Sequence, residues 1–484
     1  MVNNCVLKGL KPEGVFEFFG EILAVPRPSK HEGKMTEFLL NWANRRGLEH
    51  ERDEIGNVII RKSATKGMEN KPWVCLQAHM DMVCEKNGDK CFDFMKDAIE
   101  PRIENGWLMA TGTTLGADDG IGVATALAIL DAKDVVHGPI ECLFTVDEET
   151  GLSGANALSP TALKSRILLN LDSEDEGEMF IGCAGGVDTL AKLPFEREDT
   201  PRGAYFRICV KGLKGGHSGD DINKGLGCAN KLLNRILWEA DKEMDMRLAC
   251  FNGGNLRNAI AREAYAEVVV TEQEAEDLRR LVEKFSGDLK YEFRSTEPNM
   301  QITLESIAKP AFVVDMLSQD NLLNVLYACP HGVLAMSREI PNFVETSTNL
   351  ASVKTEENHF FITTSQRSSV ESAKVAAASR VESCFMLAGA EVEHTDGYPG
   401  WAPNTDSHVL KVAVEAYKKL FGKEPVVRAI HAGLECGLIG EKYENMDMIS
   451  YGPTLRGVHS PEERLEIATV DLFWRHTLEI LKNI

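Results

Sequence analysis

The sequence lacks several features that mark common classes of protein. No apolar run among its 484 residues approaches the ~18–20 residues that a membrane-spanning helix needs. Residues 1–20 include Lys8 and Lys11 but no continuous apolar stretch before a cleavage site, so we expect no secretory signal. The 12 cysteines are scattered and form no Cys-x-x-Cys pair. This argues against a thiolate zinc site and is typical of buried thiols in a reducing cytoplasm.

Positive charge is also scarce. The chain has 53 Lys and Arg residues against 74 Asp and Glu residues, and its formal net charge is −21 at pH 7. This charge argues against nucleic acid and anionic membranes as partners. Apolar residues make up 43% of the chain, which is enough to build hydrophobic cores. A chain of this length is expected to form two domains or more, so the composition predicts a cytoplasmic, multidomain globular protein.

Histidine and carboxylate residues follow several predicted buried strands. A short apolar strand at residues 73–76 is followed by His79 and Asp81. Similar residues stand in four more segments: Gly116-Ala-Asp118-Asp119-Gly, Thr145-Val-Asp147-Glu148-Glu149-Thr-Gly, Asn170-Leu-Asp172-Ser and Gly457-Val-His459-Ser-Pro. Imidazoles and carboxylates at successive strand ends are typical ligands of divalent cations. Two histidines and three carboxylates would over-supply one ion, so the pattern predicts two ions that share a carboxylate, and hence a two-metal hydrolase.

Each feature has a simpler explanation when it is taken alone. A single histidine at a strand end usually only forms hydrogen bonds, Asp118-Asp119 could be a turn followed by a helix N-cap, and Glu148-Glu149 could be surface acidity. His79 and Asp81 are more informative, because alternate residues of a strand share a face and a carboxylate commonly fixes the tautomer of a ligating imidazole. Together the motifs lie at corresponding strand ends, where α/β sheets bind ligands, and this favours a joint site.

One further histidine and two capping signals add to this picture. Ser460-Pro461-Glu462-Glu463 is typical of a helix start, which would hold His459 between a strand end and a capped helix. A capping box at Ser29-Lys-His-Glu32 predicts another helix near the N-terminus. His217 lies in a glycine-flanked loop that could bring an imidazole close to a substrate, although a simple turn is almost as good an explanation of the spacing.

The apolar pattern predicts one kind of layer at both ends of the chain. Continuous apolar runs at 140–146 and 167–171 are typical of buried parallel strands. Two more such runs follow at 425–430 and 446–451, and a mostly apolar helix is expected at 121–130. Strands that alternate with helices in this way predict a doubly wound, mostly parallel α/β sheet.

The middle of the chain has a different pattern. Apolar and polar residues alternate around 206–210, 264–270 and 359–364, and amphipathic helices are expected at 272–285 and 370–387. Alternation predicts antiparallel sheets that helices cover on one face. We therefore expect an α/β catalytic domain, residues 1–187 and 399–484, interrupted by an α+β lid or substrate-binding domain at residues 188–398. The insert is long enough for two subdomains.

Taken together, the motifs resemble those of the co-catalytic zinc metallopeptidases, which include carboxypeptidase G, aminoacylase-1, tripeptidase T and the carnosinases. The matching segments run in family order over nearly the whole chain: Gln77-Ala-His-Met-Asp81, Leu115-Gly-Ala-Asp-Asp-Gly-Ile-Gly122, Thr145-Val-Asp-Glu-Glu-Thr-Gly151, Asn170-Leu-Asp-Ser-Glu174, Gly216-His-Ser-Gly219, Tyr398-Pro-Gly-Trp401, Ile430-His-Ala-Gly-Leu-Glu435 and Gly457-Val-His-Ser-Pro461. Within that clan the chain resembles the bacterial aminoacyl-histidine (Xaa-His) dipeptidases. This narrower resemblance rests on the long insert and on the segments that begin at Tyr398 and Ile430.

The resemblance implies five metal ligands for two zinc ions: His79 and Asp172 for one ion, Glu149 and His459 for the other, and Asp118 for both. It implies that a hydroxide between the ions attacks the peptide bond, with Glu148 as the general base. Asp81 would orient His79, and His217 would stabilise the tetrahedral oxyanion. The family's cis peptide bond would join Asp118 to Asp119.

A dipeptidase must also recognise both ends of its substrate, a small peptide. By resemblance, Asn258 and Arg367 are candidates for the carboxylate, which a guanidinium fork binds best. Glu435 is the candidate for the free amine. Each of these three residues could equally be structural. The preference for histidine at the second position comes entirely from the resemblance.

Other functions stay open at this stage. An N-acyl-amino-acid deacylase or a broad-specificity dipeptidase would have the same catalytic half. A catalytically inactive zinc- or peptide-binding protein is a remoter alternative, against which the presence of both Glu148 and Asp81 argues. Co²⁺ or Mn²⁺ could replace Zn²⁺ at histidine and carboxylate ligands. Both a monomer and a homodimer fit the sequence. His217 could accordingly act in the site of its own chain or in that of a dimer partner.

Overall fold

The structure is a computed structural model that describes residues 6–484, and the chain divides into two compact units. Unit 1 comprises Met1–Gly182, Pro403–Ala429 and Leu434–Ile484, and unit 2 comprises Cys183–Ala402 and Ile430–Gly433. Unit 2 thus extends a few residues beyond the insert expected at 188–398. No helix within the described residues is both long and apolar enough to cross a membrane.

Unit 1 is built on an eight-stranded sheet with the order β1-β2-β6-β3-β7-β21-β8-β20. Its strands are β1 (Glu49–Arg52), β2 (Val58–Lys62), β3 (Val74–His79), β6 (Ile140–Thr145), β7 (Ile167–Asn170), β8 (Glu178–Cys183), β20 (Val426–Ile430) and β21 (Asp447–Ser450). The central strands β6, β3, β7 and β21 are parallel, and every residue of β3 and β6 is buried. The α/β prediction is confirmed, but β1, β2 and β8 pair in an antiparallel way, so the sheet is mixed.

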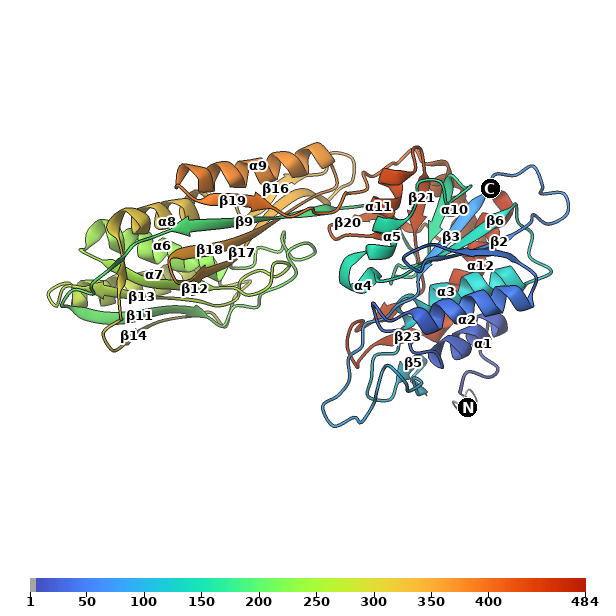
Figure 1. The fold of residues 1–484 in the computed structure, drawn as a ribbon, viewed down its shortest axis with the longest axis horizontal. Helices are drawn as coiled ribbons and strands as arrows, with labels where there is room; N and C mark the ends of the chain where they lie inside the picture. Colours follow the sequence, from blue (N-terminus) through green and yellow to red (C-terminus); the bar gives the residue numbers. More distant parts are fainter. Residues whose placement is uncertain (1–5) are drawn as a thin grey trace. The chain divides into compact units, whose positions relative to one another are not determined.

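Helices and a small second sheet complete unit 1. The helices are α1 (Glu13–Leu23), α2 (Gly33–Arg45), α3 (Ala117–Asp131), α4 (Glu148–Gly151), α5 (Ser153–Ala157), α10 (His408–Phe421), α11 (Glu435–Lys442) and α12 (Ile467–Asn483). Helix α3 packs against both β3 and α1, and α10 packs against β21 and α12 (Figure 1). The second sheet has the order β22-β23-β5-β4, from β4 (Pro101–Glu104), β5 (Trp107–Ala110), β22 (Leu455–Arg456) and β23 (Arg464–Glu466).

Neither helix begins where its side-chain cap predicts, although the helix expected near the N-terminus is present as α2. Ser460 begins a turn rather than a helix; strand β23 follows and pairs with β5, and the helix starts only at Ile467. Near the N-terminus, α2 begins at Gly33 without a side-chain cap. The Ser29 hydroxyl donates to Asp81 Oδ2 (2.7 Å), a residue far along the chain. In both places one residue of the capping pattern has a distant partner instead: Ser29 contacts Asp81, and Glu463 contacts residues 115–118.

Unit 2 contains a nine-stranded sheet made of two halves with the same βαββαβ order. The first half consists of β11 (Ala204–Lys211), α6 (Ala229–Glu243), β12 (Arg247–Gly253), β13 (Ala264–Val270), α7 (Ala275–Glu292) and β14 (Gln301–Ser306). The second consists of β9 (Gly185–Pro194), α8 (Met316–Ala328), β17 (Val344–Thr355), β18 (His359–Ser368), α9 (Glu371–Leu387) and β19 (Glu391–His394). Their strand orders, β14-β11-β13-β12 and β17-β18-β9-β19, join where β12 pairs with β17, and β16 (Gly332–Met336) also pairs with β17.

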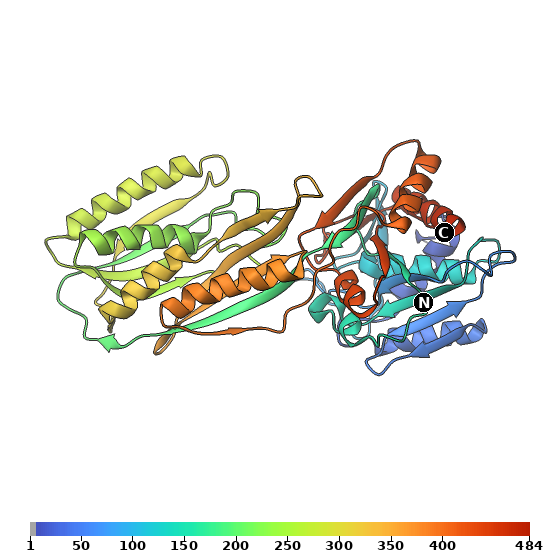
Figure 2. The same ribbon diagram turned by 90° about the horizontal axis from the view of Figure 1, so that it is seen from above.

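The four helices of unit 2 cover one face of its sheet. Neighbouring helices pack in the order α7, α6, α8 and α9 (Figure 2). Apolar side chains that alternate along the strands, such as Phe206, Ile208 and Val210 of β11, are buried beneath them. The prediction of antiparallel strands with helices on one side is therefore confirmed. A separate two-stranded ribbon pairs β10 (Arg197–Glu198) with β15 (Val313–Val314).

Candidate active site

Five side chains meet at the carboxyl ends of the central strands of unit 1. His79 is the last residue of β3, Asp118 lies in the first turn of α3, and Glu149 lies in α4, just after β6. Asp172 follows β7, and His459 lies in the turn between β22 and β23. Adjacent parallel strands end at the same edge of a sheet, which is why His79, Glu149 and Asp172 lie together. Asp118 and His459 reach this edge from α3 and from the turn between β22 and β23.

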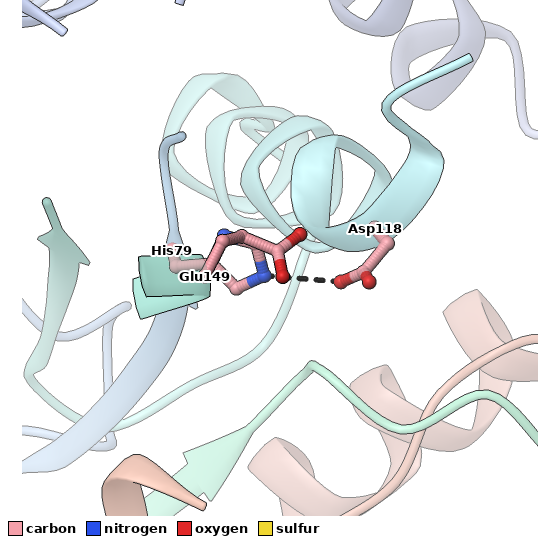
Figure 3. A group of neighbouring side chains, drawn as sticks. All are labelled: His79, Asp118 and Glu149. Atoms are coloured by element: carbon pink, nitrogen blue, oxygen red, sulfur yellow. Dashed lines mark hydrogen bonds and ion pairs between the residues drawn. The ribbon is translucent and has the colours of Figure 1, made fainter. Parts of the chain in front are cut away.

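The distances divide these five residues into two sets that share Asp118. His79 Nε2 lies 3.0 Å from Asp118 Oδ1 and 3.4 Å from Asp172 Oδ1. His459 Nε2 lies 3.2 Å from Asp118 Oδ2 and 3.0 Å from Glu149 Oε2. The two oxygens of Asp118 therefore face different imidazoles. Figure 3 shows the side chains of His79, Asp118 and Glu149 pointing toward one another, and this trio forms a group that could hold a metal ion.

The electrostatics of this cluster fit divalent cations. Burial raises the pKa of Asp172 to about 7, while hydrogen bonds from His459 and His79 outweigh burial and hold the pKa of Asp118 well below its usual value. Hydrogen bonds to Asp118 and Glu149 raise the pKa of His459 to about 11. Glu149 Oε1 is buried and has no hydrogen-bond partner within residues 6–484. Clustered carboxylates with an unused oxygen and two imidazoles are a typical ligand set for such ions.

Asp81 lies behind this cluster. Its Oδ1 is 3.3 Å from His79 Nδ1, the ring nitrogen that faces away from Asp118. The buried Asp81 carboxylate also accepts hydrogen bonds from Ser29 Oγ (2.7 Å) and from the backbone N–H groups of Glu148 (3.0 Å) and Glu149 (3.3 Å). Asp81 therefore contacts both the ring of His79 and the start of α4. The cis peptide bond that the resemblance predicts between Asp118 and Asp119 is present.

Glu148 begins α4, directly before the cluster residue Glu149. Its pKa is raised well above the usual value, chiefly by burial, with further contributions from Asp172, Glu435 and Glu149 that outweigh the charge of His79. A raised pKa brings a carboxyl group closer to the range in which it can both accept and release a proton in a reaction.

Glu435 is fully buried at the first residue of α11. Its Oε2 accepts hydrogen bonds from Gln77 Nε2 (2.6 Å) and Thr145 Oγ1 (2.7 Å), which belong to β3 and β6. Its Oε1 is buried without a hydrogen-bond partner in the part of the chain that the structure describes. Burial raises the pKa of Glu435 to about 7. One carboxylate oxygen is thus held by the protein, and the other is free to accept a hydrogen bond.

The remaining predicted site residues belong to unit 2. His217 Nδ1 accepts hydrogen bonds from the backbone N–H groups of Gly219 (3.3 Å) and Asp220 (3.2 Å), which leaves the ring proton on Nε2. Burial and the charge of Arg367 lower the pKa of His217. Asn258 is exposed in a loop that pairs with the His217 loop through the neighbouring residue Ala259. His217 is therefore a neutral imidazole with one N–H to donate.

Arg367 lies in β18 and is buried. Its Nη1 donates to Tyr398 Oη (2.9 Å), whereas its Nε is buried without a partner among the described residues. Burial, and then the charges of Arg367 and His217, lower the pKa of His431 to about 3. Its Nε2 lies 2.7 Å from Ser347 Oγ. The sequence analysis did not identify Ser347, Tyr398 or His431 as individual site residues, although Tyr398 and His431 stand in the segments that carry the resemblance.

A model of Peptidase family M20/M25/M40 matches residues 75–481 of the chain. The protein belongs to this peptidase family. It is 45% identical over 479 residues to the cytosol non-specific dipeptidase of Escherichia coli (strain K12), a match that covers 99% of both chains. The crystal structure of aminoacylhistidine dipeptidase from Vibrio alginolyticus has a TM-score of 0.93 and 44% identity, and it covers 99% of this chain and 98% of its own.

A more distant solved structure shares the fold. Aminopeptidase PepT from Bacillus cereus has a TM-score of 0.58 at 18% identity and covers 98% of both chains. The peptidase family, the enzyme class and the fold predicted from the sequence are thus confirmed.

Two buried residues beside the cluster, Arg27 and Glu463, were missed by the sequence analysis. Glu463 was interpreted only as a residue of a helix start, and Arg27 carries no motif. Both contact the backbone of the segment that ends at Asp118. A charged residue that is buried in this way is rarely without a specific partner.

Proposed function

We propose that the protein is a dipeptidase that depends on two divalent metal ions and prefers dipeptides with a C-terminal histidine. The observation that carries the proposal is the pair of Asp118 oxygens, one facing His79 and the other facing His459. Two relatives that match over almost their full length are named a non-specific dipeptidase and an aminoacylhistidine dipeptidase, and both names support dipeptide hydrolysis. The preference for histidine is supported by the second name alone. The first relative's name also supports a cytosolic location.

The proposed ligands form two sets with one shared member: His79, Asp118 and Asp172 for one ion, and His459, Asp118 and Glu149 for the other. Zinc is the metal that we propose, and Co²⁺ or Mn²⁺ would fit the same ligands. When bound, two such ions polarise the scissile carbonyl and lower the pKa of the attacking water toward ~7. Asp81 contributes by holding the His79 ring so that Nε2 faces the two carboxylates.

Glu148 is proposed as the general base. Its carboxyl group would take a proton from the attacking water and return it to the leaving amine. A base that takes a proton and later returns it needs a pKa above that of a free carboxyl group, and the pKa of Glu148 is raised in this direction. The N–H on Nε2 of the neutral His217 would donate to the oxyanion of the tetrahedral intermediate. Unit 1 would thus be the catalytic domain, and unit 2 the lid that supplies His217.

The two ends of a dipeptide carry opposite charges, so each end needs a protein group of the opposite charge. Arg367 is proposed for the carboxylate, because its buried Nε has no partner within the described residues and its Nη1 is already oriented by Tyr398. Asn258 would add an amide to the same end. Glu435 is proposed for the ammonium group, which its unpartnered Oε1 can accept. An N-acyl amino acid has no ammonium group, so the carboxylate of Glu435 favours a dipeptidase over a deacylase.

The test is hydrolysis of a substrate panel with and without Zn²⁺. Xaa-His, Xaa-Leu and N-acetylated amino acids are compared for the wild type, Glu148→Ala and Glu441→Ala, an exposed control in α11. We expect Xaa-His to be the best substrate, chelator-treated protein to be inactive until metal is restored, and Glu148→Ala to lose about 100- to 10,000-fold of kcat. Equal activity of wild type and Glu148→Ala would refute the mechanism. Faster hydrolysis of N-acetylated substrates would instead favour the deacylase.

A further inference from the structure

The carboxylate of Glu463 binds an unbroken run of backbone N–H groups. Its Oε2 accepts hydrogen bonds from Leu115 N (2.7 Å) and Gly116 N (2.9 Å), and its Oε1 accepts from Ala117 N (2.7 Å) and Asp118 N (3.4 Å). Only 2% of Glu463 is exposed. Hydrogen bonds to an ionised acceptor are stronger than those between neutral groups. This one side chain therefore fixes the path of the backbone up to Asp118.

Glu463 also belongs to the turn that carries His459. Within this turn, Ser460 Oγ donates to Gly457 O (2.7 Å), and Glu463 N donates to Ser460 O (3.0 Å). Glu463 thus connects the segment of His459 to the segment of Asp118, which come from opposite ends of the chain. His459 Nε2 and Asp118 Oδ2 lie 3.2 Å apart. Within the described residues, Glu463 forms no hydrogen bond with His79 or Asp172.

Arg27 donates hydrogen bonds to a backbone carbonyl group of the same loop. Its buried guanidinium donates to Gly116 O and also to Met80 O (3.1 Å) and Asp81 O (2.6 Å). Arg27 therefore links the segment that follows His79 to the segment that precedes Asp118. The fit is close: a Cβ on Gly116, whose φ is +71°, would lie 2.5 Å from Arg27 Nη2, so that only glycine is accommodated there.

We propose that Arg27 and Glu463 are positioning residues of the metal centre, and that Glu463 governs the ion held by Asp118, Glu149 and His459 more than the other ion. The proposal rests on the two-ion site proposed above. Arg27 bridges the segments of His79 and Asp118, whereas Glu463 bridges those of His459 and Asp118. Loss of Glu463 would let the His459 turn shift against Asp118, while His79 and Asp172 would keep their supports.

The test uses Glu463→Gln in the full-length protein. Glutamine has the same shape, but one acceptor oxygen becomes an NH₂ group that faces two backbone N–H donors. The metal-free protein is titrated with Co²⁺, and the visible d–d absorption reports each binding step without catalysis. For the wild type we expect two ions per chain. For Glu463→Gln we expect one step to weaken by about 10- to 100-fold, the usual effect of removing a group that supports a metal ligand. The other step should stay near its wild-type affinity.

Further variants identify the affected step and control for unspecific effects. His459→Ala should abolish the same step that Glu463→Gln weakens, and His79→Ala should abolish the other. Glu462→Gln changes the exposed neighbour of Glu463 and should leave both steps and the activity unchanged. At saturating Co²⁺, Glu463→Gln should recover most of the wild-type kcat, because the ligands themselves are intact.

Three outcomes would overturn the inference or its basis. If Glu463→Gln binds both ions with wild-type affinity, or if both steps weaken equally, the proposed role of Glu463 is wrong while the two-ion site stands. If the wild type binds fewer than two ions, the proposed function fails first. If circular dichroism shows that Glu463→Gln does not fold, Glu463→Asp is titrated in its place, since it keeps the charge and withdraws the carboxylate by one methylene group. We expect the same selective weakening of one Co²⁺-binding step. Equal weakening of both steps would refute the role of Glu463.

Discussion

Replacing Glu435 with glutamine should separate the recognition of the substrate amine from everything else in the site. Glu435 Oε2 accepts hydrogen bonds from Gln77 Nε2 and Thr145 Oγ1, and the carbonyl oxygen of a glutamine can accept the same two bonds. The other oxygen, Oε1, is buried without a partner among the described residues. Glu435→Gln therefore replaces only this unused acceptor by a donor. We expect the fold and the metal content to be unchanged.

The size of the effect follows from the bond that is lost. A hydrogen bond to a charged group contributes about 1.5–3 kcal/mol, which corresponds to roughly a 10- to 150-fold fall in kcat/KM. The fall applies only to substrates that have an ammonium group. A dipeptide analogue with hydrogen in place of its amino group has nothing to donate to Glu435. For that analogue we expect wild type and variant to be equal within about threefold, since no such bond is lost.

The assay measures kcat/KM for a dipeptide and for its des-amino analogue with the wild type, Glu435→Gln and Glu441→Gln. Glu441 lies in the same helix and is exposed, so its variant controls for a change of charge in α11. An equal loss of activity on both substrates would refute the reasoning, because Glu435 would then support the catalytic residues rather than the amine. No loss on either substrate would refute it as well.

Two more predictions follow from the contacts of unit 1. Asp81→Asn should weaken metal binding or kcat by about 10- to 100-fold, because the carboxylate that orients His79 is lost. Ser29→Ala removes only the hydroxyl that donates to Asp81, so it should cause a smaller loss of metal binding or kcat. Equal losses in the two variants would contradict the role of Asp81. Burial lowers the pKa of His476 to about 4. The unfolded chain, with a histidine pKa of ~6.5, then takes up the proton first as the pH falls, so this residue should cost about 2 kcal/mol of stability between pH 7 and pH 5. Urea unfolding should detect a smaller pH dependence in His476→Gln, whose amide can still donate to Ala413 O, and an unchanged pH dependence would disprove the assignment.

The strand ends of unit 1 were predictable because their signals are local. A buried parallel strand is a short run of apolar residues, and the residue that follows it lies at a known edge of the sheet. The runs at 140–146 and 167–171 correspond to β6 and β7, and β3 carries His79 to the same edge. His79, Glu149 and Asp172 are brought together for this reason, whereas Asp118 and His459 come from α3 and from the turn between β22 and β23. The alternation along β11 and β13 predicted the antiparallel sheet of unit 2 in the same way.

The errors arose where a residue of a capping pattern, Ser29 or Glu463, contacts a distant part of the chain. Ser29 and Ser460 both fit the pattern of a helix cap, yet one donates to Asp81 and the other begins a turn. Glu463 stands where a capping carboxylate would stand, but its acceptors are used by residues 115–118. A capping pattern specifies which groups are available within a few residues, and it contains no information on the rest of the chain.

The sequence by itself determined the classes of layer, the strand ends and the residues that can bind a metal, because each of these depends on residue type and short-range periodicity. Only the tertiary structure decided which oxygen of Asp118 faces which histidine, and how the buried charges of Arg27 and Glu463 are satisfied. A buried charge must find a partner wherever the fold offers one. That partner is chosen by distance in space, which the order of residues along the chain does not record.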